Sequence, residues 1–291
     1  MILSRVIKSK MDRTIKFVFK HNGQEVEFSY IDNYTDKDII CVPCQTMCNM
    51  SCDFCYLTKH VGGIKSKNIE SSSIFLAIKH IWQNLGLSKN KRPLLISFMG
   101  SGEPMDNIIE VIDTMKLVRE FYTHSKFAIS TIMPKKSKNM ESFNYLVQQA
   151  LIHPELKIKL HLSLHYTEDD IREVHMPSAS RISESVNCLK VYGETTCNEI
   201  EVHYILSTDT FQDDNAELQL SYKLGQILAT VKKHVTVKFM AYSDEQNNSK
   251  RVIDSCAEII VMYMKNQGFN KVEYYKPPGN DIGSGCGQFI L

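Results

Sequence analysis

The sequence predicts an α/β protein built on a parallel β-sheet. Six short segments rich in β-branched and aromatic residues alternate with amphipathic stretches, in which apolar residues recur at three- and four-residue intervals. Strands that alternate with helices in this way form parallel sheets with right-handed crossovers. Such a sheet can close as a partial barrel or stay open, and the periodicity does not decide between them. In both arrangements ligands bind at the carboxyl ends of the strands.

The elements follow one another in a regular order. Near the start, the alternating segment 14–31 is interrupted by Asn22-Gly23, a pair that adopts positive φ at both turn positions and predicts a β-hairpin. The predicted strands span 38–43, 93–100, 126–131, 157–165, 200–206 and 235–242. The predicted helices span 72–87, 107–122, 141–152, 182–193, 216–233 and 250–269. The tail from Tyr274 onward is rich in Gly and Pro and predicts a loop.

Composition and charge exclude several classes of protein. With 291 residues, of which 43% are hydrophobic and 23% charged, the chain can bury a substantial core. The net charge of +1 gives no overall attraction to nucleic acid. No apolar run approaches the ~20 residues of a membrane span, and the first residues lack the apolar core of a signal peptide. We therefore expect a cytoplasmic protein without membrane contact, in which clustered cysteines indicate metal binding or catalysis.

Five of the nine cysteines lie between Cys41 and Tyr56. Three of them have the spacing C-x3-C-x2-C: Cys48, Cys52 and Cys55. Three thiolates on one loop can hold three corners of a 4Fe–4S cluster and leave the fourth iron open to a small molecule. A structural zinc site needs four nitrogen or sulfur ligands, usually in two pairs. A second pair is missing, because Cys188, Cys197 and Cys256 are scattered across predicted helices. The spacing therefore favours iron–sulfur, with zinc as the alternative.

This spacing, with Phe54 just before the last cysteine, resembles the radical S-adenosylmethionine (SAM) superfamily. Four more features resemble the rRNA adenine methyltransferases RlmN and Cfr. These are the Gly-x-Gly-Glu-Pro motif in 96–107, Cys41 seven residues before the first cysteine of the motif, the Ser-Leu-His strand end in 162–177, and the loop 279–289. The resemblance implies a partial (β/α)6 TIM-like barrel of the radical SAM type. It divides the chain into an N-terminal β-hairpin extension (1–37), the barrel (38–275) and a C-terminal loop (276–291).

The resemblance also implies which residues bind the cofactors. Cys48, Cys52 and Cys55 would hold the 4Fe–4S cluster, whose open iron would bind SAM, with two SAM molecules used per turnover. The backbone of Gly100 and Gly102 and the carboxylate of Glu103 would meet the methionine end of SAM, since a carboxylate accepts hydrogen bonds from an ammonium group. The rest of the SAM pocket would be lined by Ser130, Ser163, His165 and Ser243, where Ser243 stands in place of the family's SAM-binding asparagine. Taken without the resemblance, Ser130, Ser163 and His165 are ordinary polar residues at strand ends.

Two further cysteines would be catalytic in such an enzyme. Cys286 would accept a methyl group from one SAM, and the radical formed from a second SAM would activate that methyl group for addition to an adenine carbon. Cys41 would help remove the ring proton and form a disulfide with Cys286 as the product leaves, so an external electron donor such as flavodoxin or ferredoxin would restore the enzyme. Cys44 is interpreted as a bystander.

The chain departs from the family in places that bear on the substrate. The family's N-terminal accessory domain is not expected here, because only about a dozen residues precede the hairpin. Gly283-Ser284-Gly285 stands where the family has aspartate-alanine-alanine, and Pro277 and Pro278 replace polar or basic residues. We therefore expect a monomer that methylates adenine, at carbon 2 by preference, in a small adenine-containing molecule or in RNA. The alternatives are a radical SAM enzyme of another reaction type and a zinc-stabilised α/β binding module.

Overall fold

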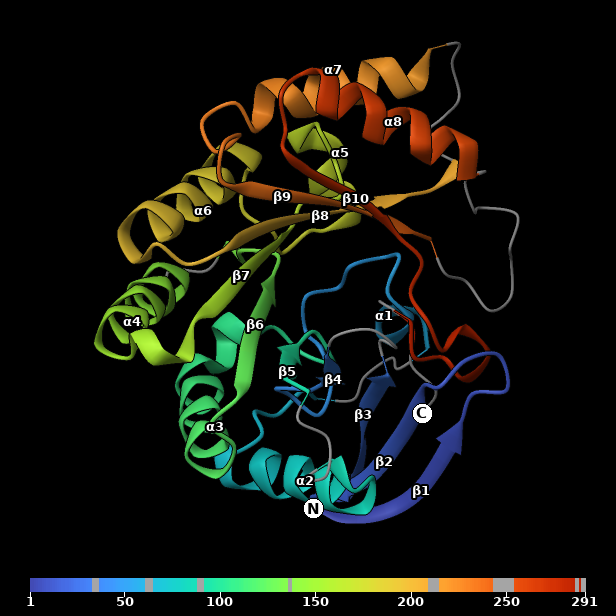
Figure 1. The fold of residues 1–291 in the computed structure, drawn as a ribbon, viewed down its shortest axis with the longest axis vertical. Helices are drawn as coiled ribbons and strands as arrows, with labels where there is room; N and C mark the ends of the chain where they lie inside the picture. Colours follow the sequence, from blue (N-terminus) through green and yellow to red (C-terminus); the bar gives the residue numbers. More distant parts are fainter. Residues whose placement is uncertain are drawn as a thin grey trace.

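The computed structural model describes residues 1–32, 37–60, 65–87, 92–135, 138–208, 215–242, 254–285 and 288. Within them a 10-stranded sheet has its strands in the order of the sequence, from β1 to β10 (Figure 1). The strands are β1 (Ile2–Lys8), β2 (Ile15–His21), β3 (Gln24–Asp32), β4 (Asp38–Cys41), β5 (Leu94–Phe98), β6 (Ser125–Thr131), β7 (Ile158–Ser163), β8 (Ile200–Leu206), β9 (Val235–Ala241) and β10 (Lys271–Tyr275).

The first four strands are antiparallel to one another. The predicted hairpin is confirmed: β2 pairs with β3, and the turn between them has φ of 49° at Asn22 and 81° at Gly23. Positive φ at both positions matches the right-handed twist of the two strands. β1 was not predicted, and it adds a third antiparallel strand to this N-terminal sheet extension.

From β4 onward all strands are parallel. The six predicted strands correspond to β4 through β9, so the α/β class and the parallel sheet are confirmed. A seventh parallel strand, β10, pairs with β9 and includes Tyr274 and Tyr275, where the sequence predicted a loop. The prediction was wrong for these two residues because they extend a short strand that precedes the Gly/Pro-rich tail.

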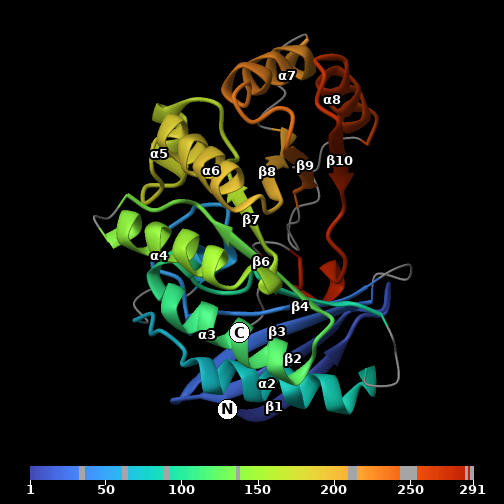
Figure 2. The ribbon, with the colours of Figure 1, turned by 60° about the vertical axis from the view of Figure 1, so that its left-hand side comes forward.

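Helices connect the parallel strands and cover the outer face of the curved sheet (Figures 1 and 2). They are α1 (Tyr56–His60), α2 (Ser71–Asn84), α3 (Ile108–Phe121), α4 (Lys138–Ile152), α5 (Asp169–His175), α6 (Ile182–Thr196), α7 (Ala216–Ile227) and α8 (Asp254–Asn266). Among the described helices, none is long and apolar enough to cross a membrane.

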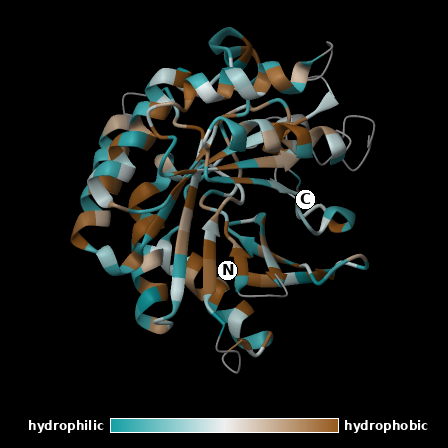
Figure 3. Cartoon of the chain, turned by 45° about the horizontal axis from the view of Figure 1, so that its top comes forward, coloured by the Kyte–Doolittle hydropathy of each residue, from teal (hydrophilic) through white to brown (hydrophobic). Residues whose placement is uncertain are grey.

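The two faces of the parallel strands differ in character. Residues that face the helices form the hydrophobic core, and many are fully buried, such as Ile96, Leu160 and Val202. Figure 3 shows hydrophobic residues along the inner strands and a mixture of both kinds on the surrounding helices. Alternate residues point to the inside of the curved sheet, and several of these are polar or charged. The inner face of the barrel is therefore available for a site.

The sheet does not close on itself, because β1 and β10 are its two edges. After β10 the segment 279–285 returns to the N-terminal strands (Figures 1 and 2). Asp281 accepts hydrogen bonds from Ser9 Oγ (2.7 Å) and from the Lys10 backbone N–H (2.8 Å). Lys16 Nζ donates to the Gly283 carbonyl over 2.8 Å. The start and the end of the described chain thus meet across the open side of the barrel.

Candidate active site

The three cysteines of the C-x3-C-x2-C motif lie on the loop that follows β4, at the carboxyl end of the strand. They line a cavity of about 140 Å³, which we call the cysteine-loop cavity. Its other lining residues include Gly100, Gly102, Glu103, Ser130, Ser163 and His165. The structure therefore brings together the candidate cluster ligands and all the described candidate SAM-binding residues. Ser243 lies outside the described residues.

The surroundings of the three thiols are apolar. Met50, Ile132 and Met176 form a small hydrophobic cluster with them. Burial raises the pKa of the Cys48 thiol to about 12 and that of Cys52 further still. Neutral thiols are thus favoured when no cation is bound.

The three thiols line one cavity, but no fourth cysteine or histidine of the described chain forms a tight metal-binding group with them. Among the described residues, the one group of three metal-binding side chains with ligand atoms within 4.8 Å of one another is His161, Glu201 and His203, and it contains no cysteine. A structural zinc site needs four nitrogen or sulfur ligands, whereas three thiolates are enough to hold three irons of a 4Fe–4S cluster.

Glu103 is buried beside the cysteine loop, with 3% of its surface exposed. Its carboxylate accepts hydrogen bonds from the backbone N–H groups of Met105 (3.0 Å) and Ile132 (3.1 Å), and from the Thr131 side chain. Burial nevertheless raises the pKa of Glu103 to about 7. A carboxylate has about four acceptor positions, so one remains for an ammonium group, whose charge would favour the ionised form.

The two glycines before Glu103 are required by close packing. A Cβ on Gly100 would lie 2.7 Å from the backbone nitrogen of Pro43. Gly102 has φ of +102°, and a Cβ there would lie 2.7 Å from the Cβ of Gln45. The expectation was that these glycines let the backbone approach SAM. The structure adds that they let the segment after β5 pack against the loop after β4.

The polar residues at the strand ends have defined partners. Ser130 Oγ hydrogen-bonds to His161 Nδ1 over 3.1 Å. His165 has φ of 60°, and its Nδ1 accepts the backbone N–H of Ile205 over 3.2 Å. The His165 ring packs edge-on against Phe54 of the cysteine loop, with 5.1 Å between ring centroids. His165 therefore holds the cysteine loop against the barrel.

Arg172 was not recognised from the sequence, although it lies in a segment that carried the resemblance. It is 1% exposed, at the C-terminal part of α5. Its guanidinium donates to backbone carbonyls of Ile132 (3.0 Å), Ser180 (3.2 Å) and Ser163 (3.2 Å), and also to Leu164. These contacts join the ends of β6 and β7 beneath the cysteine loop.

Cys41 lines a second cavity of about 290 Å³, inside the barrel, which we call the Cys41 cavity. Four residues line both cavities: Met99, Gly100, His203 and Met240. Cys286 lies outside the described residues, while Gly285 and Gln288 line the Cys41 cavity. None of the described cysteines is in a disulfide, so a disulfide is not supported for this state of the chain.

The remaining cysteine of the cluster, Cys44, is 2% exposed and donates to the Ser101 carbonyl over 3.7 Å. Burial raises its pKa well above the usual value. Its role as a bystander stays a prediction.

Four titratable residues on the inner face of the barrel were not recognised from the sequence. His161, Glu201, His203 and Lys238 all line the Cys41 cavity. They occupy neighbouring strands in register, with His161 opposite Glu201 and His203 opposite Lys238. Polar side chains at alternate positions of otherwise apolar parallel strands were the available signal.

No family model matches the chain. The chain is 28% identical to the probable dual-specificity RNA methyltransferase RlmN of Clostridium acetobutylicum, over 97% of this chain and 77% of that protein. It is 29% identical to the RlmN protein of Clostridium beijerinckii, over 97% of this chain and 75% of that protein.

Solved structures give a similar result. A radical SAM methyltransferase from Sphaerobacter thermophilus matches with a TM-score of 0.81 at 19% identity, over 98% of this chain and 80% of that one. A spore photoproduct lyase variant matches with a TM-score of 0.56 at 9% identity, over 81% of this chain and 76% of that one.

The fold is the mixed α/β partial barrel of the radical SAM type, with antiparallel strands at its N-terminus. The chain is similar to the RlmN methyltransferases over nearly its whole length, and its fold matches that of a radical SAM methyltransferase. These similarities favour a radical SAM enzyme over the alternative of a zinc-stabilised binding module.

Proposed function

We propose that this chain methylates an sp2 carbon of adenine, with carbon 2 favoured, by way of a methylated cysteine. The observation that carries the proposal is the arrangement of two adjoining cavities. One is lined by the three candidate cluster ligands and the other by Cys41, and the two share four wall residues. A reaction started at the cofactors would thus have a substrate cavity and a second thiol next to it.

The residues of the cysteine-loop cavity fit the cofactors that the family implies. Cys48, Cys52 and Cys55 would hold a 4Fe–4S cluster. Gly100, Gly102, Glu103, Ser130, Ser163, His165 and Ser243 would bind SAM. When bound, these cofactors would supply the methyl group and the radical chemistry of the family. The protein would orient SAM, with the Glu103 carboxylate facing its ammonium group, and would exclude water through the apolar residues around the thiols.

Two thiols would handle the substrate. An adenine ring carbon is electron-poor, so it does not attack a methyl donor directly, and a carbon attached to the Cys286 sulfur would be joined to the ring instead. Cys41 would remove the ring proton. Its sulfur would then bond to the Cys286 sulfur while the carbon–sulfur bond breaks. The released carbon would take up a proton to become the product's methyl group, and the unpaired electron of the adduct would pass to a one-electron acceptor such as the bound cofactor. The Cys41–Cys286 disulfide would be reduced by an external donor such as flavodoxin or ferredoxin.

The substrate is either RNA or a small adenine-containing molecule. The relatives' names make RNA one candidate. The Cys41 cavity, at about 290 Å³, is near the lower end of the size range of small-ligand pockets. Several of its charged side chains are paired internally: Glu27 with Lys16 at 2.8 Å, and Lys238 with Glu201 at 2.8 Å. This pairing supports a nucleoside-sized ligand with little need for phosphate contacts.

The test is the intact mass of the protein produced with its iron–sulfur cluster, followed by peptide mapping of the C-terminal segment. We expect one added methyl group on Cys286 in the wild-type chain. Cys286→Ala should lose both this modification and methylation of adenine substrates. Cys256→Ala, a change on α8, should retain both. An unmodified Cys286 in protein that has a full cluster and bound SAM would show that the methyl-carrier role is wrong.

A further inference from the structure

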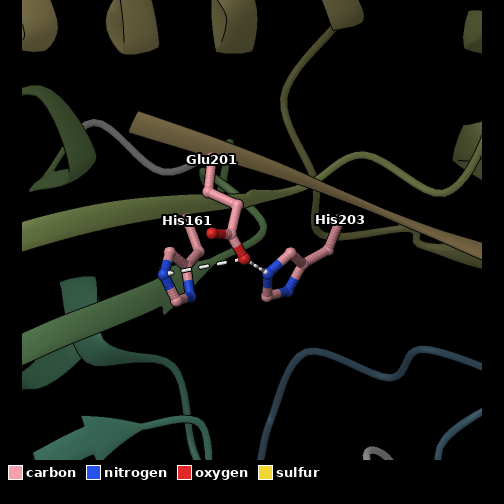
Figure 4. A group of neighbouring side chains, drawn as sticks. All are labelled: His161, Glu201 and His203. Carbon is pink, nitrogen blue, oxygen red and sulfur yellow. Dashed lines mark hydrogen bonds and ion pairs between the residues drawn. The ribbon is translucent and has the colours of Figure 1, made fainter. Parts of the chain in front are cut away.

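His161, Glu201 and His203 form a compact cluster on the inner face of the barrel (Figure 4). The Glu201 carboxylate lies between the two imidazoles, 2.6 Å from His203 Nε2 and 4.0 Å from His161 Nε2. All three residues are buried: His161 is 6% exposed, Glu201 2% and His203 4%. All of them line the Cys41 cavity, so a molecule bound there would contact them.

The charge on Glu201 is stabilised by its neighbours. Oε1 accepts from His203 and from Lys238 Nζ at 2.8 Å, while Lys159 Nζ lies 3.5 Å from Oε2. Burial alone would raise the pKa of Glu201, but these contacts outweigh it and hold the pKa well below its usual range. Glu201 is therefore a carboxylate that only accepts hydrogen bonds. With about four acceptor positions and three donors, it has room for one more donor.

His161 supplies the complementary group. Its Nδ1 is hydrogen-bonded to Ser130 Oγ, but its Nε2 is buried without a hydrogen-bond partner among the described residues. The nearby carboxylate favours the tautomer with the proton on Nε2, with the Ser130 hydroxyl donating to Nδ1. A buried N–H without a partner is unfavourable, and a ligand atom that accepts from it would remove this cost.

A metal ion is a poor occupant of this cluster. Lys238 already places an ammonium 2.8 Å from Oε1, the Glu201 oxygen that contacts both imidazoles. At that separation a second cation next to the same oxygen would be strongly repelled. The unfilled positions are instead one acceptor on the Glu201 carboxylate and one donor on His161, two residues that stand opposite each other on paired strands and line the same cavity.

We propose that Glu201 and His161 recognise the amino-substituted edge of a nitrogen heterocycle, so that the Cys41 cavity selects a 6-aminopurine over a 6-oxopurine. On such an edge an amino group donates beside a ring nitrogen that accepts, and this pattern complements an acceptor on Glu201 beside a donor on His161. A 6-oxopurine presents the reverse pattern, an N–H beside a carbonyl. Its carbonyl oxygen would face the Glu201 acceptor and its N–H would face the His161 donor, so neither hydrogen bond could form. This inference rests on the proposed function and specifies which residues recognise its substrate.

The experiment compares the binding of adenosine and inosine by calorimetry. It uses the cluster-loaded protein with saturating S-adenosylhomocysteine, which occupies the SAM site and prevents reaction. We expect adenosine to bind at least about tenfold more tightly than inosine to the wild-type chain. In Glu201→Gln, whose amide can donate as well as accept, the ratio should fall to about threefold or less. Glu258→Gln is the matched control, because it neutralises an exposed carboxylate of α8 outside the cavity and should keep the wild-type ratio.

Several outcomes would overturn the proposal. Equal binding of the two nucleosides by the wild-type chain would do so without any variant, and so would binding of neither. Zinc bound in equimolar amount and lost in His161→Asn would show that the cluster is a metal site. The proposed function is tested separately: a methylated Cys286 together with equal nucleoside binding removes only the recognition proposal. Discrimination without Cys286 methylation would leave recognition intact and remove the methyl-carrier mechanism.

Discussion

At the scale of single residues, His161 makes the stability of the protein depend on pH. Burial, with the nearby ammonium groups of Lys159 and Lys238, lowers its pKa well below the usual value, although Glu201 acts in the opposite direction. The folded chain therefore keeps His161 neutral below pH 6.5, where the unfolded chain takes up a proton. Because the unfolded state then binds more protons, the free energy of unfolding falls as the pH is lowered, by up to about 1.4 kcal/mol per pH unit for this group.

The measurement is urea denaturation between pH 5 and pH 8 for the wild-type chain and His161→Asn. We expect the variant to be less stable at pH 8 but to lose less stability on acidification. His234→Asn, a change at an exposed histidine, should keep the wild-type slope. Parallel pH curves for wild type and His161→Asn would contradict the prediction.

The same residues show what could be predicted of the site. Cys48, Cys52 and Cys55 were recognisable because three ligands on one short loop have a fixed spacing along the chain. Glu201 and Lys238 were not recognised as a site. They meet only through the pairing of different strands, and the sequence does not say which face of a parallel strand points inward. Residues gathered from several strands become a site only when the register of the sheet is known.

At the scale of elements, the contribution of the backbone conformation of the β2–β3 turn to stability can be measured without a change in side-chain packing. Gly23 has φ of 81°, and an added Cβ would have no atom within 4 Å. Gly23→Ala should therefore destabilise the chain by about 1 kcal/mol through backbone strain alone. Asn22→Gly should be nearly neutral, because Asn22 already has φ of 49°. Thermal unfolding of both variants checks this, and equal melting temperatures would contradict it.

The two missed strands, β1 and β10, share one property that explains why they were missed. Each is an edge of the sheet and pairs with a single neighbour. Most residues of β1 are exposed, and β10 has only 5 residues, so neither has the apolar pattern that marked the inner strands. The periodicity of apolar residues indicates which side chains are buried. An edge strand with few buried side chains is held mainly by its backbone hydrogen bonds, which this periodicity does not reveal.

At the scale of the whole molecule, the N-terminal strands and the C-terminal segment form one unit. Lys16 is 1% exposed and bridges Glu27 and the Gly283 carbonyl, each at 2.8 Å. Asp12 accepts the backbone N–H of Gly279 over 2.7 Å. These contacts fix the segment that leads to Cys286 against residues that are distant in sequence. The antiparallel extension thus has a role in placing the C-terminal segment as well as in covering the barrel.

Asp281 is the contact that can be removed with least damage, because it is exposed while it bonds to Ser9 and Lys10. Asp281→Ala should raise amide hydrogen exchange in 279–285 by about tenfold, since two hydrogen bonds to a carboxylate are lost. Methylation of Cys286 should fall, because the segment is no longer held at the Cys41 cavity. The melting temperature should change little, as the core is untouched. Asp170→Ala, at an exposed position of α5, is the control. Unchanged exchange in Asp281→Ala would mean that Lys16 and Asp12 hold the segment without it.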